Sequence, residues 1–221
     1  MPVTFTNRHG GTSLGVYSSL NLGGHVGDSP ADVLRNREVI AESLGPVHFM
    51  NQVHGDRIAI IEGITEEPPT VDALITGIPG ITLAVMVADC IPLILTSQEV
   101  VAAVHVGRRG LVNQIAIKTI ELMREMGAQD ISATIGPAIC GSCYEVSADI
   151  HQEVISQFPS ADARTASGSL ALDLPKALYG VLQSVGVSIN SSESRCTVED
   201  PALFSYRRDG VTGRQAGLVS L

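Results

Sequence analysis

The stretch Thr82-Leu83-Ala84-Val85-Met86-Val87-Ala88-Asp89-Cys90 decides the fold. Its first seven residues form a nearly continuous apolar run, which predicts a strand buried on both faces. Residues 100–104 repeat this pattern and lead to His105. In open α/β sheets, ligands bind beyond the carboxyl ends of such strands. We therefore expect Cys90 and His105 to lie together at one edge of a sheet.

Helices are expected before and after these strands along the chain. Ser29 and Pro30 supply a cap and a first-turn proline for a helix over 30–44. Gly107 and Gly110 predict a tight turn into a helix over 111–126. This alternation is typical of a mixed α/β (α+β) fold. Further helices are expected over 147–158, capped by Ser147, and over 174–185, and shorter strands over 47–50, 57–61, 130–135 and 217–221, the last after a hairpin within 204–216.

The composition predicts one compact globular domain over residues 1–221, because 44% of the residues are hydrophobic and only 17% are charged. The formal net charge is −9, from 23 acidic and 14 basic residues. Without a basic run, we expect no nucleic-acid partner. The chain does not open on an apolar signal segment, and prolines and an aspartate interrupt its longest apolar stretch, 78–95. We therefore expect no membrane partner and a cytoplasmic location, and the oligomeric state stays open.

Three side chains with zinc-binding atoms stand in separate short segments. Two imidazole nitrogens and a thiolate suit Zn²⁺, and three protein ligands leave a fourth position for water or substrate, as in catalytic zinc sites. The four cysteines, in a chain with no secretory signal, are expected to be reduced and free to bind metal. The ligands predicted for one zinc ion per chain are His54 in Gln52-Val53-His54-Gly55, Cys90 in Ala88-Asp89-Cys90, and His105 in His105-Val106-Gly107-Arg108-Arg109-Gly110.

Together with further motifs, these segments carry a resemblance that runs almost end to end. The chain resembles the YfiH-type family, called polyphenol oxidoreductase laccases in older naming and purine nucleoside phosphorylases or adenosine deaminases in newer naming. The resemblance implies layered mixed β-sheets flanked by helices, and a zinc ion on His54, Cys90 and His105. The further motifs are Thr6-Asn7-Arg8-His9-Gly10-Gly11, Ser19-Leu20-Asn21-Leu22-Gly23, Asn36-Arg37, Gly136-Pro137-Ala138-Ile139, Tyr144-Glu145-Val146 and the segment 204–215.

The activity implied by the resemblance is zinc-dependent chemistry on purine nucleosides. One reaction is phosphorolysis of adenosine, inosine, guanosine or methylthioadenosine to the free base and a sugar 1-phosphate, and the other is deamination of adenosine to inosine. For deamination, Asp89 beside Cys90 is the candidate proton shuttle. For phosphate binding the candidates are Arg8 and, at a helix N-terminus, Arg108 or Arg109. Asn21 and His25 are candidate contacts for the ribose or the base.

One position departs from the family pattern. The family usually has tryptophan between the glycine and the arginine of the segment that His105 opens, whereas this chain has Arg108 there. A flat apolar ring is thus replaced by a cation, which can alter substrate packing or add a phosphate or carboxylate contact.

Two other functions compete with chemistry on purine nucleosides. A copper-dependent polyphenol oxidase is implied by the older family name, but several coppers need many histidines and the chain has six. The other is a non-enzymatic role or a cysteine hydrolase with Cys90 as nucleophile and His105 as base, the latter because the fold of this family resembles that of a deamidating toxin domain. Metal content separates the three functions. The segment Cys140-Gly141-Ser142-Cys143 has the spacing of a redox motif, but it is interpreted as a structural loop, and Arg207 and Arg208 are expected to pair with acidic neighbours.

Overall fold

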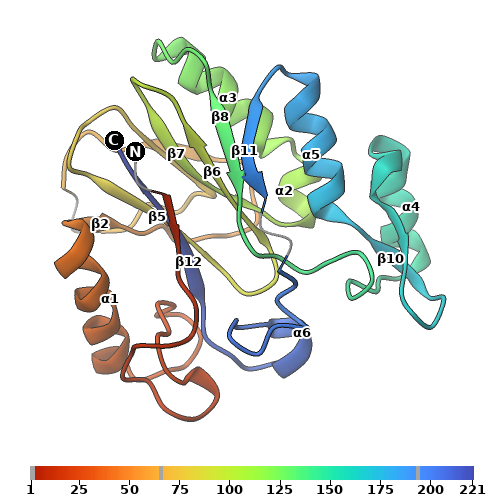
Figure 1. The fold of residues 1–221 in the computed structure, drawn as a ribbon, viewed down its shortest axis with the longest axis horizontal. Coiled ribbons are helices and arrows are strands. Elements are labelled where there is room, and N and C mark those ends of the chain that lie inside the picture. The colour runs from red at the N-terminus through yellow and green to blue at the C-terminus, as the bar shows by residue number, and fades with distance from the viewer. Residues whose placement is uncertain (1–2, 65–66, 193–194) are drawn as a thin grey trace.

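Two mixed β-sheets packed face to face form the centre of the protein (Figure 1). The computed structural model describes residues 3–64, 67–192 and 195–221. The four-stranded sheet has the order β1 (Val3–Phe5), β12 (Gln215–Ser220), β5 (Thr82–Val87), β2 (Val47–His48). The six-stranded sheet has the order β11 (Ser188–Ser192), β8 (Ser132–Ile135), β6 (Ile91–Thr96), β7 (Val101–Val106), β4 (Ala73–Thr76), β3 (Ile58–Ile60).

The strand β5 is buried on both faces, as its apolar run predicts. Successive side chains of a strand point to opposite faces of its sheet. Leu83 and Val85 accordingly pack between the two sheets, whereas Ala84 and Met86 pack on the opposite face. Each face of β5 therefore has its own apolar cover, which explains why polar residues do not alternate with apolar ones along it.

Helices cover the two outer faces of the sheet pair. Helix α1 (Pro30–Leu44) packs on the four-stranded sheet through Ile40 and Leu44, and its bounds are those predicted from Ser29 and Pro30. Helices α3 (Ile115–Glu125) and α5 (Leu174–Ser184) cover the six-stranded sheet. The result is a layered α/β arrangement, which confirms the predicted fold class. Helix α4 (Ala148–Gln157) and the small hairpin of β9 (Asp162–Arg164) and β10 (Leu170–Leu172) lie at one end.

The prediction of a single helix over 111–126 is wrong. The structure has α2 (Arg108–Val112), which begins after Gly107, and then α3, with Gln114 in the left-handed region (φ 60°) between them. Gly110 lies inside α2 rather than in a turn. A Cβ at Gly110 would be 3.2 Å from the carbonyl oxygen of His105, so this helix lies close against the end of β7.

Other sequence expectations need smaller corrections. The segment 204–216 contains no hairpin but a short helix, α6 (Tyr206–Asp209), capped by the hydroxyl of Ser205, before β12. Ser147 is the N-cap of α4, yet its side chain makes no capping hydrogen bond. Strands β4 and β6 were not predicted, because Pro92 and the polar residues around these runs read as interruptions. Within the part of the chain that the structure describes, no helix is long and apolar enough to cross a membrane.

A buried asparagine fixes the long connection between β1 and α1. Asn36 of α1 has no solvent exposure, and its amide nitrogen donates to the carbonyl oxygens of Ser19 (3.1 Å) and Asn21 (2.9 Å). Its side-chain oxygen accepts from the backbone N–H of Thr12 (2.8 Å). Since buried polar groups need partners, one amide sets the path of this segment over the helix.

We expect Asn36→Ala to lower the free energy of unfolding by about 2–4 kcal/mol, because several buried polar groups lose their partner at once. Urea denaturation measures this change. The matched control is Arg35→Ala on the same helix, which removes only an exposed ion pair with Asp32. That control should change the free energy by less than about 1 kcal/mol, and an equal effect of both substitutions would contradict the anchoring role.

Candidate metal centre and pocket

The crossing of the two sheets brings His54, Cys90 and His105 together. Cys90 stands in the short connection between β5 and β6, and so passes from one sheet to the other. Because β6 is antiparallel to β7, with Pro92 opposite His105, the start of β6 lies beside the end of β7. The expected proximity therefore exists, but the predicted route is wrong, because the two residues do not follow neighbouring strands of one sheet.

The three side chains converge on one point. Their candidate ligand atoms all lie within 4.8 Å of one another. Cys90 Sγ is 3.8 Å from His54 Nε2, and the two imidazole rings meet edge to face with centroids 4.6 Å apart. His105 is buried, Cys90 is half-buried and His54 is exposed, so the group opens to solvent on one side. Two nitrogens and a sulfur around an open position match the donor set of a catalytic zinc site.

The carboxylate of Asp72 orients the two histidines of this group. It has no solvent exposure, and His105 Nδ1 donates to it at 2.8 Å. A carboxylate only accepts hydrogen bonds, so His105 keeps a proton on Nδ1, and Nε2 is the nitrogen that can give up its proton and bind a metal. The same carboxylate accepts from the backbone N–H of His54 (2.9 Å) and of Gly55 (2.7 Å). One buried charge thus holds both histidines.

The backbone around the group leaves little room. A Cβ on Gly107 would lie 3.0 Å from Cys90 Sγ and 3.1 Å from His54 Cδ2, so a side chain there would crowd both candidate ligands. His54 itself has a positive φ of 57°, which is uncommon outside glycine. Such backbone strain persists where the surroundings over-determine it, and it is frequent at functional sites. These features and the donor set fit a bound metal ion.

The electrostatics of the group favour a thiolate. Burial alone would raise the pKa of the Cys90 thiol, but the charge and hydrogen bond of His105, with those of His54, lower it to about 6. Burial would lower the pKa of His105, yet Cys90 and Asp72 raise it. Cys90 is therefore ionised at neutral pH, which is the form that binds metals and attacks electrophiles.

A pocket of about 600 Å³ opens beside the three residues. This volume lies within the range of small-molecule sites. Its wall combines apolar side chains, two tyrosines and two arginines. The lining residues are His25, Gln52, His54, Met86, Val87, Ala88, Asp89, Cys90, His105, Ile139, Tyr144, Tyr206, Arg207 and Arg214.

The predicted substrate contacts lie in different surroundings, and only His25 is among the lining residues. Arg8 donates to the carbonyl oxygen of Ser18 and lies over the ring of Phe204. Asn21 is fully buried, and its side-chain oxygen accepts hydrogen bonds from the backbone N–H groups of Gly23 and Arg214. Arg108 forms an ion pair with Glu153 of α4 (2.8 Å), and Arg109 is exposed on α2. These four residues stay predictions as substrate contacts.

Asp89 lines the pocket, and its carboxylate accepts hydrogen bonds from neighbouring segments. One oxygen accepts from the hydroxyls of Thr197 and Ser205, both at 2.6 Å, and the other accepts from the backbone N–H of Arg207 at 2.7 Å. Its backbone φ is 103°, a further strained position beside the group. Asp89 therefore ties α6 and the turn after Cys196 to the connection that carries Cys90.

Sequence reasoning missed several residues of this site. Arg207 was expected to pair with acidic neighbours, but it lines the pocket and its guanidinium lies 5.3 Å from the ring centroid of Tyr144. Arg208 does bind Asp209, as expected. Asp72 and Arg214 were not singled out. An acidic residue directly before a buried strand was the one available signal for Asp72, because a charge there needs a partner.

Comparisons with known proteins agree over nearly the whole chain. A family model described as multi-copper polyphenol oxidoreductase laccase matches residues 2–221. A purine nucleoside phosphorylase of Corynebacterium glutamicum is 43% identical, with 98% of this chain and 93% of the relative covered, and one of Streptomyces coelicolor is 44% identical, with 98% and 94% covered. The crystal structure of the Bacillus licheniformis hypothetical protein YfiH superposes with a TM-score of 0.89 at 30% identity, covering 99% of this chain and 92% of that chain.

We expect Asp72→Asn to weaken Zn²⁺ binding by roughly 10- to 100-fold. An amide has one accepting oxygen, so whichever way it turns, two of the four donors that now face the carboxylate lose their acceptor, and the negative charge beside His105 is lost. Competition with a chromophoric chelator measures the affinity. The matched control is Asp56→Asn, since Asp56 is an exposed carboxylate that pairs with Lys118. Equal affinities of the two variants would contradict the role given to Asp72.

Proposed function

This chain belongs to the multi-copper polyphenol oxidoreductase laccase family, and from its pocket we propose that it is a zinc-dependent enzyme acting on purine nucleosides. Membership agrees with the YfiH-type resemblance carried by its sequence motifs. The observation that carries the proposal is one pocket in which a His, Cys, His donor set faces two tyrosines and two arginines. Relatives at 43–44% identity that are named purine nucleoside phosphorylases support the substrate class.

We propose His54, Cys90 and His105 as the ligands of one zinc ion. Zinc held there supplies a Lewis acid at the floor of the pocket. The chain's own contribution is to keep the ligands in place: Asp72 holds His105 in the tautomer that presents Nε2, and it fixes the turn that carries His54. Gly107 leaves the space in which the ligand atoms meet.

The aromatic side of the pocket suits a purine ring. Tyr206 lines the pocket and is 62% exposed, so its ring is accessible to a ligand. Tyr144 also lines the pocket, and Met86, Val87 and Ile139 add apolar surface. A flat heterocycle gains by stacking on tyrosine rings while its polar edges stay within reach of side-chain donors.

We place the phosphate of phosphorolysis at Arg207 and Arg214. Both residues line the pocket, and arginine binds phosphate oxygens in a bidentate manner. Burial and the positive charges of Arg214 and Arg37 lower the pKa of His25, so this imidazole is neutral at pH 7 and acts as a hydrogen-bonding group toward the sugar or base. In the reaction a phosphate oxygen bonds to ribose C1′ while the C1′–N9 bond breaks, and the base takes up a proton.

For deamination of adenosine we propose Asp89 as the proton carrier. It is the one carboxylate among the pocket-lining residues within the described chain, and it adjoins Cys90. Water replaces the amino group at C6 and ammonia leaves, so protons must pass from the water to the ring and the leaving nitrogen. The carboxylate accepts three hydrogen bonds, two of them on Oδ1, so Oδ2, which accepts only from the N–H of Arg207, keeps a lone pair for the proton.

We propose zinc rather than copper on the supply of ligands. Multi-copper oxidation needs histidine-rich clusters. Across the described residues, two groups of side chains have the geometry to hold a metal, and together they contain two of the six histidines, His54 and His105. The described residues therefore hold too few clustered histidines to bind the several copper ions that the older family name implies.

A second candidate function is a cysteine hydrolase, and one observation favours it. Cys90, His105 and Asp72 stand in the order of a nucleophile, a base and a carboxylate that orients the base. His54 argues for metal instead, because its Nε2 also faces Cys90 Sγ and a nucleophile with its base has no use for a second imidazole. If iodoacetamide alkylates Cys90 equally fast with and without added zinc, the hydrolase is favoured.

We expect the zinc-loaded protein to convert inosine to hypoxanthine and ribose 1-phosphate only when phosphate is present. With adenosine, adenine reports phosphorolysis and inosine reports deamination, and deamination alone continues when phosphate is omitted. Liquid chromatography of the products separates the two reactions. No product from adenosine, inosine, guanosine or methylthioadenosine would contradict the proposed function.

We expect Cys90→Ala to lose one equivalent of bound zinc and to lower kcat/KM at least about 100-fold, because the thiolate ligand is gone. Elemental analysis and the product assay measure the two effects. The matched control is His9→Ala, which changes an exposed residue outside the pocket lining. Full turnover in the Cys90 variant would exclude the proposed centre.

We expect Arg207→Ala to raise the KM for phosphate by about 10-fold or more while the zinc content stays unchanged, because a charge-assisted contact is lost. The comparison is Arg8→Ala, the phosphate contact predicted from the sequence. Steady-state kinetics with varied phosphate decide between them. A raised KM in the Arg8 variant alone would move the phosphate to Arg8.

A further inference from the structure

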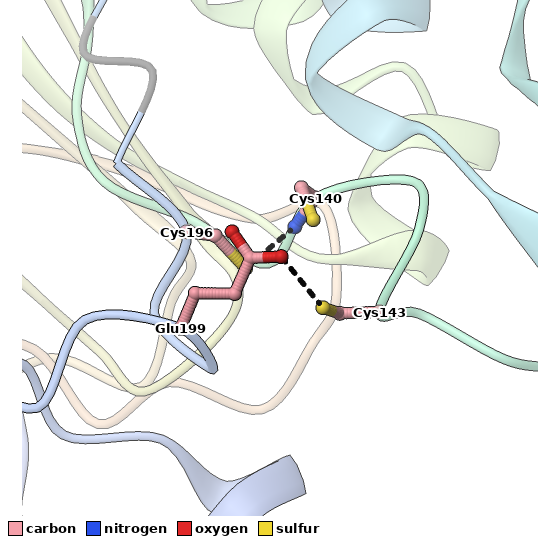
Figure 2. A group of neighbouring side chains, drawn as sticks. All are labelled: Cys140, Cys143, Cys196 and Glu199. Atoms are coloured by element: carbon pink, nitrogen blue, oxygen red, sulfur yellow. Dashed lines mark hydrogen bonds between the residues drawn. The ribbon is translucent and has the colours of Figure 1, made fainter. Parts of the chain in front are cut away.

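Two short turns face each other and bring four side chains together (Figure 2). One is Cys140-Gly141-Ser142-Cys143 and the other is Cys196-Thr197-Val198-Glu199. Each carries two metal-binding side chains three residues apart, and the two turns are 56 residues apart in the sequence, as the contacts of Cys140 with Cys196 and of Cys143 with Glu199 record. Paired turns with this spacing are the way in which structural zinc sites are built.

The four side chains already point toward one centre. The sulfur atoms of Cys140, Cys143 and Cys196 and a carboxylate oxygen of Glu199 all lie within 4.8 Å of one another. Sulfur ligands of tetrahedral zinc are about 3.8 Å apart, given a Zn–S distance of about 2.3 Å. The thiol of Cys143 meets Glu199 Oε1 at 3.6 Å, and the backbone N–H of Cys140 donates to the sulfur of Cys196 at 3.4 Å. A small contraction is enough to close a four-ligand shell.

The backbone holds both turns in this arrangement. The N–H groups of Cys143 and Tyr144 donate to the carbonyl oxygen of Cys140, and the N–H of Asp200 donates to that of Cys196. A β-bridge between Ala138 and Cys196 joins the two segments. Gly141 approaches the start of α5 so closely that a Cβ would lie 2.8 Å from Asp173 Cβ. The turns are thus seated by the rest of the protein, as a preformed site requires.

We propose that Cys140, Cys143, Cys196 and Glu199 bind a second zinc ion in a closed, structural site. Three thiolates and a carboxylate fill the four positions of tetrahedral zinc and leave none for substrate. Binding releases the thiol protons to solvent. Cys196 is buried, the other two cysteines are half-buried and Glu199 is exposed, so an ion can enter from the side of Glu199.

The second ion fastens the wall of the pocket. Ile139 and Tyr144 flank the first turn and line the pocket. In the second turn, the hydroxyl of Thr197 donates to Asp89 at 2.6 Å, beside Cys90. A metal that joins the turns therefore restrains groups on two sides of the pocket. This inference does not rest on the proposed function, because it concerns different ligands and a structural role.

Zinc content by elemental analysis of protein purified under reductant, without added metal, tests the proposal. We expect two zinc ions per chain in the wild type, and one each in Cys143→Ser and in Cys90→Ala. Cobalt identifies which site remains. Co²⁺ in the Cys90 variant should show roughly three times the thiolate charge-transfer absorbance per ion of Co²⁺ in the Cys143 variant, because three sulfurs bind it rather than one.

The carboxylate ligand has its own test. Glu199→Gln should weaken zinc binding at the second site at least about 10-fold, whereas Glu145→Gln, which alters an exposed carboxylate near the first turn, should not. Equal affinities of these two variants would overturn the four-ligand site.

Peptide mapping of the wild type covers the case in which Cys143→Ser does not fold. With zinc bound, Cys140, Cys143 and Cys196 should resist iodoacetamide, and a chelator should expose all three together. A single zinc ion per chain, with these cysteines alkylated freely or two of them joined in a disulfide, would overturn the proposal. If the wild-type protein binds two zinc ions but does not turn over nucleosides, only the proposed function is contradicted.

Discussion

A carboxylate without solvent exposure, Asp72, must be compensated inside the protein, and its partners define the candidate metal centre. It accepts from the ring of His105 and from the backbone N–H groups of the turn around His54. An unpaired buried charge costs several kcal/mol, so each partner is held strongly. The backbone carbonyl of Asp72 also accepts from the N–H of His105, which adds a second link to β7. The position of two histidines is therefore set by the need to satisfy one charge.

The third member of the centre depends on how the two sheets are joined. Residues 88–90 pass from β5 in one sheet to β6 in the other, and Asp89 takes a positive φ of 103° in doing so. Three hydrogen bonds to its carboxylate compensate for this strain. The same bonds draw α6 toward Cys90, so that Tyr206 and Arg207 form part of the pocket wall. A tight crossing thus supplies both a thiolate and the frame of a binding site.

The two candidate metal groups divide their tasks along chemical lines. The group of His54, Cys90 and His105 opens to a pocket and leaves a coordination position free, as a catalytic ion needs. The group of three cysteines and Glu199 would supply four ligands to the proposed second ion, and Ile139 and Tyr144, which flank its first turn, line the pocket. The link between them is Thr197, which follows Cys196 and binds Asp89. An ion at the second group would therefore restrain the segment that contacts Asp89, beside Cys90.

The sequence by itself determined the features that depend on neighbouring residues. The buried run of β5 and the bounds of α1 follow from side-chain period and capping, and the motifs around His54, Cys90 and His105 identified the family. The break at Gln114 and the helix α6 escaped prediction because tertiary packing overrode local pattern.

Only the tertiary structure decided which distant residues meet. It placed β5 and β7 in different sheets, put Asp72 under His105, turned Arg207 into the pocket, and joined Cys196 and Glu199 to the turn of Cys140 and Cys143. These contacts depend on strand register and on the satisfaction of buried polar groups. Local sequence patterns carry no record of either, since both arise only when segments far apart in the chain pack together.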